Sequence, residues 1–507
     1  MQTLIDELLS EQSVLQTPVA KFSEVHDRLP DLQPHYRQLI PLEKPDKGEG
    51  EQYAFEVALD RCTGCKACVS ACHSLNGLDE DESWRDVGVM VGGGEAPAWQ
   101  QTVTTACHHC EDPACLNGCP VEAYEKEEDT GIVRHLDDQC IGCSYCILKC
   151  PYDVPKYSKK RGIVRKCDMC HQRLMEGEAP ACVQSCPTEA IRIVTVKTGE
   201  AAQAERVFME GQGEHSALAE SDITLPTTRY TGRRLPATAY AADRDVLVVQ
   251  HSHWPLVLML VLTQSGLGLL LATCLQPAAG VAFSLVGVSL FMAGMVSAVF
   301  HLGQPLKAWR FFLGLRTSWL SREILAFSVL VPLPLLWIGL NFISDFTFKD
   351  SLFATVRMLM PLFALLAVFT SVMIYHDTKR SLWRVDRTSL RFFGTLLLMG
   401  VAVLDQPWIF GILTMAKLAW EYSFLRLRTQ KDWSPDAHSA RLMAGPLRFA
   451  CMLRGTMALC AVGASFVSPW PAIFLLLGAE LLERMVFFRA VSAPKMPGNF
   501  GPRSAQS

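Results

Sequence analysis

Cysteine spacing constrains this chain of 507 residues more than any other feature of its sequence. Sixteen of the nineteen cysteines fall into four groups of four. The groups are Cys62, Cys65, Cys68 and Cys72; Cys107, Cys110, Cys115 and Cys119; Cys140, Cys143, Cys146 and Cys150; and Cys167, Cys170, Cys182 and Cys186. Three thiolates at C-x2-C-x2-C spacing can wrap one face of an iron–sulfur cubane, whose fourth iron then needs a cysteine from elsewhere in the chain. The first and third groups have this spacing, which predicts a fold built around such clusters.

Three other uses of these cysteines are weighed against clusters. Zinc ribbons use two well-separated C-x2-C pairs and leave the third cysteine of each run unexplained. A disulfide framework needs an oxidising compartment. The stretch "CDMCH" at residues 167–171 also matches the C-x-x-C-H pattern of c-type haem attachment, but the fourth group needs both of its cysteines. Iron–sulfur clusters remain the favoured interpretation.

The second half of the chain is dominated by apolar runs of about 17–25 residues, the length that lets a helix cross a bilayer. Eight runs are predicted to do so, at roughly 247–275, 280–300, 323–343, 356–376, 390–404, 407–425, 448–468 and 471–489. The fifth run is short, and "DQPW" at residues 405–408 is compatible with a tight turn or with a kink in one long helix. We expect an all-α membrane domain of about eight transmembrane helices.

Composition divides the chain into five parts. Residues 1–50 are predicted to be an amphipathic and flexible extension, in which acidic residues interrupt the apolar positions, so no secretory signal is expected. Residues 51–196 hold the clusters, 197–245 form a polar linker, 246–490 form the membrane domain and 491–507 form a flexible tail. A net charge of -4 without a domain-wide basic face argues against nucleic-acid binding.

The loop between the second and third predicted spans, "HLGQPLKAWRFFLGLRTSWLSRE", begins with His301 and ends with Glu323. Ionisable residues at a membrane surface are functional candidates. Quinol oxidation releases electrons, which need a nearby cluster, and protons, which need acceptors such as His and Glu. The basic residues of the loop are candidates to dock the cluster domain. In a purely structural interpretation, His301 caps a helix end and Glu323 pairs with Arg322.

Two sets of motifs resemble one known family. Residues 53–195 resemble the four-cluster, ferredoxin-like α+β iron–sulfur subunit of the dimethyl sulfoxide reductase family, in "CPYDVPKY" after the third group and in the "KCDMC…CVQSCP" spacing of the fourth. "HLGQP" and "SWLSREI" resemble that family's membrane anchor subunit, as do "HWPL" at residues 253–256 and "GAELLERMVFF" at residues 478–488. The chain is similar to a fusion of the two subunits.

The resemblance implies four 4Fe–4S clusters and a quinol site that uses His301 and Glu323. The implied ligand sets are Cys62, Cys65, Cys68 and Cys186; Cys167, Cys170, Cys182 and Cys72; Cys107, Cys110, Cys115 and Cys150; and Cys140, Cys143, Cys146 and Cys119. His253, Glu480 and Arg484, which also lie in matching stretches, are interpreted as structural. No haem is expected, because the membrane histidines fall near helix ends or in loops.

By the same resemblance, the chain is expected to oxidise menaquinol or ubiquinol and to pass electrons to a separate molybdopterin enzyme, as in dimethyl sulfoxide-dependent anaerobic respiration. The terminal substrate chemistry then belongs to that partner, because this chain has no domain left for molybdopterin. One alternative reverses the flow and reduces quinone. An alternative of another class is a membrane redox sensor or ion-translocating protein, which needs charged residues in mid-helix; Lys417 and Glu421 are the nearest candidates.

Charge around the predicted spans predicts the orientation. The loops on the side of the cluster domain carry Lys307, Arg310, Arg316, Arg322, Lys379, Arg380, Arg384, Arg387, Arg391, Arg426, Arg428, Lys431, Arg441 and Arg448. The opposite loops carry Lys349, with Arg357 at the edge of a span. Because positive loops stay in the cytoplasm, we expect a multi-pass protein of the inner (cytoplasmic) membrane whose iron–sulfur domain faces the cytoplasm.

Overall fold

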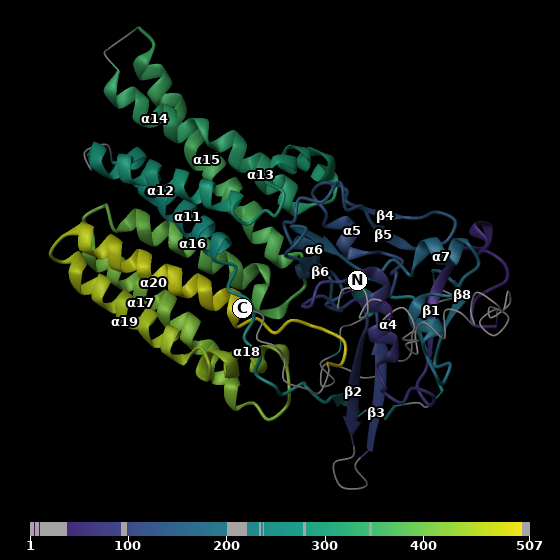
Figure 1. Ribbon diagram of the computed structural model, residues 1–507. Helices are drawn as coiled ribbons and strands as arrows, with labels where there is room; N and C mark the ends of the chain where they lie inside the picture. The colour runs from purple at the N-terminus through teal and green to yellow at the C-terminus, as the bar shows by residue number, and fades with distance from the viewer. Residues whose placement is uncertain are drawn as a thin grey trace.

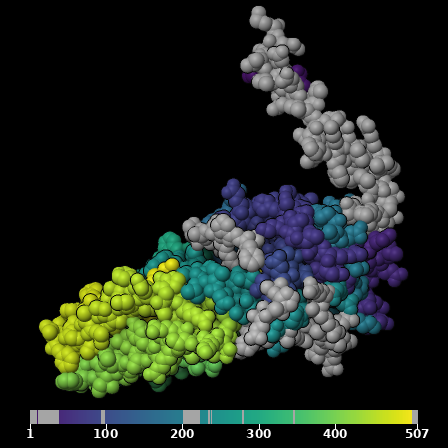
Figure 2. Space-filling model, turned by 90° about the horizontal axis from the view of Figure 1, so that it is seen from below, coloured from purple at the N-terminus to yellow at the C-terminus, as the bar shows by residue number. Residues whose placement is uncertain are grey.

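A computed structural model of the chain describes residues 38–92, 99–199, 221–232, 238–276, 280–343 and 347–498, together with residues 5, 10, 218, 235 and 236. The amphipathic extension predicted for residues 1–50 therefore lies largely outside the described residues. Strands and short helices make up the iron–sulfur half, residues 38–245, and long helices make up the helical half, residues 246–498. The two halves lie at opposite ends of the molecule (Figures 1 and 2).

Two three-stranded sheets frame the iron–sulfur half. In the first sheet, β1 pairs antiparallel with β8 and parallel with β9, and in the second the order is β10-β2-β3. β4 and β5 form a hairpin, as do β6 and β7. The strands are β1 (Glu51–Ala58), β2 (Asp86–Gly92), β3 (Trp99–Thr105), β4 (Tyr124–Lys126), β5 (Val133–His135), β6 (Lys156–Ser158), β7 (Ile163–Arg165), β8 (Ile191–Lys197), β9 (Arg229–Thr231) and β10 (Tyr240–Ala241).

The cysteine groups lie in loops and in the short helices that follow them, namely α4 (Ala67–Asn76), α5 (Ala114–Asn117), α6 (Tyr145–Lys149), α7 (His171–Met175) and α8 (Ala181–Gln184). Two of these loops carry glycine between the first two cysteines, and Gly64 and Gly142 adopt φ values of 74° and 69°. Only glycine enters this left-handed region at little cost. The glycines thus let the backbone turn back on itself between neighbouring cysteines.

Two segments predicted to be a linker and a tail pack against the iron–sulfur half. The predicted linker contributes β9 and β10, and Thr224 Oγ1 lies 3.0 Å from the Tyr152 hydroxyl. Residues 491–498 return from the helical half, and Met496 is buried in the core of the iron–sulfur half. In the segment predicted to be a flexible tail, residues 491–498 are held by buried Met496 and by an ion pair between Lys495 and Asp243.

The helical half is a bundle of long helices joined by short helical turns (Figure 1). Its elements are α11 (Trp254–Leu275), α12 (Val281–Val299), η5 (Pro305–Arg316), α13 (Trp319–Leu330), α14 (Pro332–Phe342), α15 (Lys349–His376), η6 (Ser381–Trp383), α16 (Val385–Val401), α17 (Pro407–Ser423), η7 (Phe424–Thr429), α18 (Pro435–Ala444), α19 (Arg448–Ser465) and α20 (Pro469–Arg489). α13 and α14 together form one apolar stretch, with Pro332 at the break between them.

Four stretches of the described residues are long and apolar enough to cross a membrane: Trp254–Leu275, Val281–Val299, Trp319–Phe342 and Lys349–His376. The pair α18 and α19, bent by 74°, raises the number to at most five. The predicted count of eight is not confirmed, because α16 and α17 have 17 residues each and α19 and α20 carry several charged side chains. The "DQPW" stretch is a turn between α16 and α17, with Asp405 at φ 53°.

Candidate functional site

The cysteines assigned together from sequence lie side by side in the structure. Each set is named by its first cysteine: the Cys62 quartet with Cys186, the Cys167 quartet with Cys72, the Cys107 quartet with Cys150 and the Cys140 quartet with Cys119. All four members of the Cys62 quartet line one pocket, between β2 and the loop before α4. Cys186 reaches this pocket from a loop more than a hundred residues farther along the chain.

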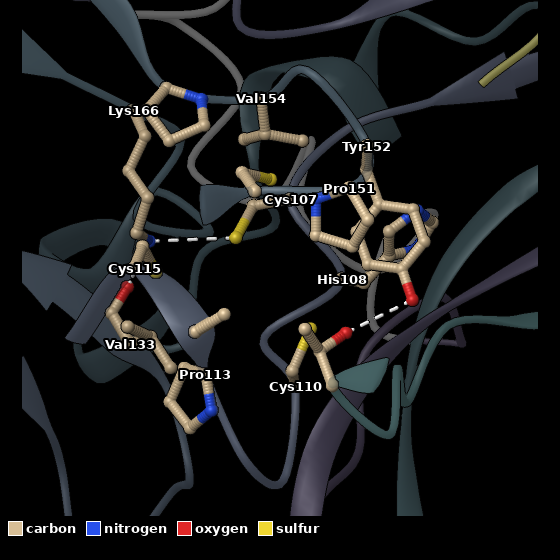
Figure 3. Close-up of a pocket in the computed structure, with 14 residues that line it drawn as sticks. Cys107, His108, Cys110, Pro113, Cys115, Val133, Pro151, Tyr152, Val154 and Lys166 are labelled. Carbon is tan, nitrogen blue, oxygen red and sulfur yellow. Dashed lines mark hydrogen bonds between the residues drawn. The ribbon is translucent and has the colours of Figure 1, made fainter. Parts of the chain in front are cut away.

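The Cys107 quartet lines a second pocket, which Figure 3 shows. Its wall also contains His108, Tyr152 and Lys166. Lys166 Nζ lies 3.5 Å from Cys107 Sγ and donates to the carbonyl of Cys167 at 2.9 Å. Burial raises the pKa of the Cys150 thiol to about 11. A thiol in this environment needs a strong positive centre to stay ionised, which bound metal provides.

In each of the other two quartets, electrostatic interactions between the thiols show that the members lie close together. The thiol of Cys72 interacts electrostatically with those of Cys182 and Cys170, and the thiol of Cys167 interacts with that of Cys72. In the Cys140 quartet, the thiol of Cys146 interacts with those of Cys143, Cys140 and Cys119. Each quartet therefore joins three cysteines of one loop or loop pair to a fourth from a distant group.

Contacts between quartets arrange them in one series. Cys68 of the Cys62 quartet interacts with Cys182 of the Cys167 quartet, and Cys167 interacts with Cys107 of the next quartet. The Tyr124 ring lies between the Cys107 and Cys140 quartets, since it interacts with Cys115 of the first and Cys146 of the second. The series Cys62, Cys167, Cys107 and Cys140 therefore runs toward the helical half.

The donor set fits an iron–sulfur cluster better than a single metal ion. No three His, Cys, Asp or Glu side chains within the described ranges converge closely enough to hold one ion. In a cubane each thiolate binds a different iron, so the four thiolates stand farther apart than they do around one zinc ion. Four thiols around one pocket, without a carboxylate among them, match that requirement.

The loop of residues 301–323 docks onto the Cys140 quartet. His301 Nε2 lies 3.0 Å from the carbonyl oxygen of Cys143. The backbone amide of Gln304 donates to the carbonyl of Ile141 at 3.0 Å, and the amide of Gly314 donates to the carbonyl of Pro120 at 3.1 Å. The helical half is thus bonded to the backbone on both sides of the Cys140 quartet.

Glycines make this docking possible. A Cβ added to Gly303 would lie 2.0 Å from the carbonyl oxygen of Gly162, and one added to Gly142 would lie 2.3 Å from the same oxygen. Of the loop's basic residues, Arg310 alone hydrogen-bonds to the described part of the iron–sulfur half, through the carbonyl of Asp138 at 3.3 Å. Among the candidate docking residues of the loop, Arg310 thus makes a side-chain bond to the iron–sulfur half, while backbone atoms and glycines make the other contacts described above.

Three histidine rings meet edge to face beside this contact. The ring centroids of His253 and His301 are 5.7 Å apart, and those of His251 and His253 are 4.8 Å apart. Burial lowers the pKa of His301 to about 4 and that of His253 to about 3. Because a carbonyl only accepts, His301 Nε2 carries the proton and donates to Cys143, which leaves Nδ1 as the accepting nitrogen. His301 is not the cap of a helix end.

Glu323 lies in the first turns of α13 with 5% of its surface exposed. Its carboxylate accepts a hydrogen bond from the hydroxyl of Ser371 on α15. It does not pair with Arg322, whose guanidinium donates instead to the carbonyls of Leu315 and Arg316. Glu323 also interacts electrostatically with Tyr145, two residues beyond Cys143. His301 and Glu323 therefore face the same turn of the iron–sulfur half.

Sequence reasoning missed three residues at this contact. The Tyr145 hydroxyl donates to the carbonyl of Ile374 at 3.1 Å and lies 3.1 Å from Asp377 Oδ2. Lys149 Nζ forms an ion pair with Asp377 at 2.7 Å. Tyr145 and Lys149 are four residues apart on one helix, which places them on the same face and could have indicated a shared contact. Their partners, however, lie more than two hundred residues away in the sequence.

Seven charged side chains form a cluster that is buried between α16, α17, α19 and α20. From the sequence, only Lys417 and Glu421 were named as candidates for charges in mid-helix. Arg454 lies 2.6 Å from Glu421, Arg391 lies 2.6 Å from Glu483, and Lys417 pairs with Glu480. Arg484 is the seventh member, with Glu483 at 3.4 Å. The charges at positions 480, 483 and 484, inside an apolar run, were the signal that this helix packs against charged neighbours.

Comparison with known proteins gives two family matches. Residues 99–196 match a family model described as a 4Fe-4S dicluster domain. Residues 249–427 match the model of the DMSO reductase anchor subunit (DmsC). The two matches fall on the iron–sulfur half and on the helical half, in the same order along the chain.

Individual relatives match the iron–sulfur half. The B subunit of anaerobic dimethyl sulfoxide reductase from Escherichia coli (strain K12) is 43% identical over 148 residues, which are 28% of this chain and 72% of that protein. The B subunit of the Haemophilus influenzae enzyme is 35% identical over 185 residues, which are 35% of this chain and 87% of that protein. The formate dehydrogenase-O iron-sulfur subunit of E. coli (strain K12) is 35% identical over 174 residues, which are 31% of this chain and 58% of that protein.

Proposed function

Because the chain belongs to the family of dimethyl sulfoxide reductase iron–sulfur subunits and continues into a DMSO reductase anchor domain, we propose that it oxidises quinol in the membrane and passes the electrons through four 4Fe–4S clusters to a separate catalytic subunit. One observation carries this proposal. His301, in the membrane-surface loop, bonds directly to the backbone of Cys143, a member of the Cys140 quartet. Electrons released beside His301 thus have a cluster within reach.

The sixteen cysteines of the four quartets are proposed as the cluster ligands. When bound, the clusters supply one-electron transfer, and the chain's residues hold them in series. Protein purified without oxygen should contain about sixteen irons per chain, the sum of four cubanes. An iron content near twelve, or zinc in place of iron, would contradict the ligand assignment.

His301 and Glu323 are proposed as the proton acceptors for quinol oxidation. His301 Nδ1 can accept one proton while Nε2 stays bonded to Cys143, and the Glu323 carboxylate can accept the other. His301→Ala and Glu323→Gln should each slow cluster reduction by a quinol analogue about a hundredfold, the effect of losing a general base. Cluster spectra should stay unchanged.

Two variants on the same side of the helical half serve as controls. His376→Ala, at the end of α15, and Asp386→Asn, at the start of α16, remove a similar group outside the proposed site. Both should reduce the clusters at the rate of the unmodified chain. Normal rates in the His301 and Glu323 variants would place quinol oxidation elsewhere.

The Cys62 quartet lies farthest along the series from the helical half, and Cys65 is exposed there. This end is proposed to face a molybdopterin-containing catalytic subunit. Copurification from the membrane tests this, and recovery of the chain with a catalytic subunit that lacks molybdenum would contradict it. The reverse reaction, reduction of quinone by a substrate-oxidising partner, uses the same residues, and the relative rates of the two directions in the isolated complex decide between them.

The iron–sulfur half is proposed to face the cytoplasm, from the concentration of basic residues in the loops beside it. The reversed placement would put the Lys307, Arg310 and Arg316 side chains outside the cell. A cysteine placed at exposed Leu42 should resist a membrane-impermeant thiol reagent in intact cells and react after lysis. Reaction in intact cells would overturn the assignment.

The buried charge cluster favours a second candidate function, ion translocation driven by electron transfer. That function needs charged side chains inside the bundle, and Lys417, Glu421, Arg454 and Glu480 supply them. A chain that translocates ions should acidify or alkalinise the lumen of sealed vesicles beyond the protons of quinol itself, and Lys417→Met should abolish the excess. Proton release that matches quinol oxidation alone would exclude this function.

A further inference from the structure

Two buried cations of the iron–sulfur half have no carboxylate partner. Arg85 and Lys166 are each 2% exposed. Arg165, the third buried cation there, pairs with buried Glu82. Within the described part of the chain, neither Arg85 nor Lys166 has an Asp or Glu oxygen within 4.0 Å. Burying an uncompensated charge costs several kcal/mol, so these two positions call for another source of negative charge.

Arg85 lies between the Cys62 and Cys167 quartets. Its guanidinium donates to Thr104 Oγ1 at 3.2 Å, and the same hydroxyl lies 3.6 Å from Cys68 Sγ. The guanidinium also covers the Phe55 ring at 4.6 Å. The thiols of Cys182, Cys68, Cys167 and Cys72, which belong to both quartets, interact with Arg85 in their ionised form.

Lys166 lies between the Cys107 and Cys167 quartets. Its ammonium group is 3.5 Å from Cys107 Sγ (Figure 3). It also donates to the carbonyls of Cys167 and Val133. The negative groups that act on it are the thiols of Cys107, Cys115 and Cys167. Both cations therefore occupy a junction between two quartets.

The quartet beside the helical half is different. The basic group near the Cys140 quartet, His135, pairs with Asp137 at 2.8 Å. The junction between the Cys140 and Cys107 quartets holds the uncharged Tyr124 ring. Arg380, a buried cation of the helical half, interacts electrostatically with Asp153 and Cys150 but forms no ion pair within 4.0 Å with the described residues. Among the described residues of the iron–sulfur half itself, the unpaired buried cations thus lie at the two junctions farther from the helical half.

We propose that Arg85 and Lys166 are fixed counter-charges for the clusters of the three quartets beside them, and that they raise the reduction potentials of those clusters relative to the cluster of the Cys140 quartet. The inference rests on the proposed function, because it takes the quartets to hold clusters. A cluster bound by four thiolates is anionic, and one-electron reduction makes it more negative. A nearby buried cation therefore stabilises the reduced form.

This arrangement of charges favours one direction of electron transfer along the series of clusters. Electrons that enter at the Cys140 quartet move toward clusters that hold them more tightly, which favours flow away from the membrane and therefore quinol oxidation. Arg85 and Lys166 are positioning residues for this flow, because Lys166 contacts a cluster ligand directly and Arg85 contacts one through Thr104, and neither contacts substrate or quinol.

The test is a redox titration of the anaerobically purified full-length chain, followed by electron paramagnetic resonance. Arg85→Gln and Lys166→Gln remove the charge, and Arg85→Lys and Lys166→Arg retain it. Each Gln variant should lower the equilibrium constant for reduction of an adjacent cluster at least about tenfold, which is about 59 mV for one electron. The charge-retaining variants should restore most of it. The cluster of the Cys140 quartet is the internal control, and its potential should not move.

Iron content separates this inference from the proposed function. Full iron with unchanged potentials in both Gln variants would overturn the inference alone, whereas iron that does not amount to four clusters in the unmodified chain would overturn the ligand assignment. If both Gln variants lose iron and both charge-retaining variants keep it, the clusters need these charges, and the inference stands. If the charge-retaining variants also lose iron, the clusters depend on the shape of the Arg85 and Lys166 side chains and not on their charge. That result would overturn the inference.

Discussion

The four cations buried between α16, α17, α19 and α20 each face a glutamate, whereas Arg85 and Lys166, buried in the iron–sulfur half, face none. In the helical half, Glu421, Glu480 and Glu483 supply the opposite charge from within the chain. In the iron–sulfur half, the nearest negative groups are the cysteine thiols. The first region therefore compensates most of its buried charge within the polypeptide, with three carboxylates for four cations. The two cations of the second region are compensated by what its cysteines bind.

The two regions compensate their buried charges differently because their surroundings differ. A bundle in a membrane must compensate its charges internally, because lipid supplies neither water nor counterions. Seven side chains do this here through neighbouring pairs, such as Arg454 with Glu421 and Arg391 with Glu483, both at 2.6 Å. The iron–sulfur half has a different partner for its charges, and an internal carboxylate at Arg85 or Lys166 would oppose cluster reduction.

Removal of iron should have the largest effect on this comparison. A chelator and an oxidant together would leave Arg85 and Lys166 buried without counter-charge and would expose four sets of thiols, so residues 51–197 should lose their folded structure. The helical half should keep its helices. Hydrogen exchange before and after treatment measures both regions in one sample, and persistent protection of β1 and β8 would show that the iron–sulfur half is complete without metal.

The converse disruption in the helical half is Glu480→Ala. This change leaves Lys417 and Arg454 facing one carboxylate fewer inside the bundle, and breaking a buried pair typically costs about 3–5 kcal/mol. The free energy of unfolding in detergent should fall by this amount, while iron content stays unchanged. Lys417→Met in addition should recover part of the loss, because it removes the stranded charge. A double variant less stable than Glu480→Ala would contradict the pairing.

A smaller effect is expected where the two regions meet. Tyr145→Phe removes the hydroxyl that donates to the carbonyl of Ile374 and lies beside Asp377. Loss of one such hydrogen bond typically costs about 1 kcal/mol. Hydrogen exchange at residues 374–377 should therefore rise by about fivefold, with no change around Arg391 or Glu483. Unchanged exchange at the contact would indicate that Gly303 and its backbone bonds hold the two halves together unaided.

The smallest effect should follow Asp386→Ala. This residue pairs with Arg384 at 3.3 Å, and both side chains are more than half exposed. Exposed pairs contribute about 0–1 kcal/mol because water and salt screen them. The free energy of unfolding should change by less than about 0.5 kcal/mol, which sets the scale for Glu480→Ala. A loss of several kcal/mol here would show that exposure does not separate the two classes of pair.

Features that depend on local spacing could be predicted from the sequence. Ligand spacing and helix length are local properties, because they depend only on residues close together in the sequence. Examples are the C-x2-C-x2-C runs, the glycines at positions 64 and 142, and the apolar lengths of α11, α12 and α15. The loop from His301 to Glu323 stood out for the same reason, since charge at the edge of an apolar run is visible without knowing what covers it.

Which charged groups of the helical half meet became visible only in the folded chain. Glu480, Glu483 and Arg484 lie in an apolar run that looked like a membrane span, and their partners on α16, α17 and α19 lie about 25 to 95 positions earlier in the chain. The eight runs likewise looked equivalent, although four or five stretches of the described residues qualify as spans. Helices α16, α17, α19 and α20 bury charges against one another. A charge is costly or harmless according to the side chain it faces, and packing sets that partner, so spacing along the sequence cannot reveal it.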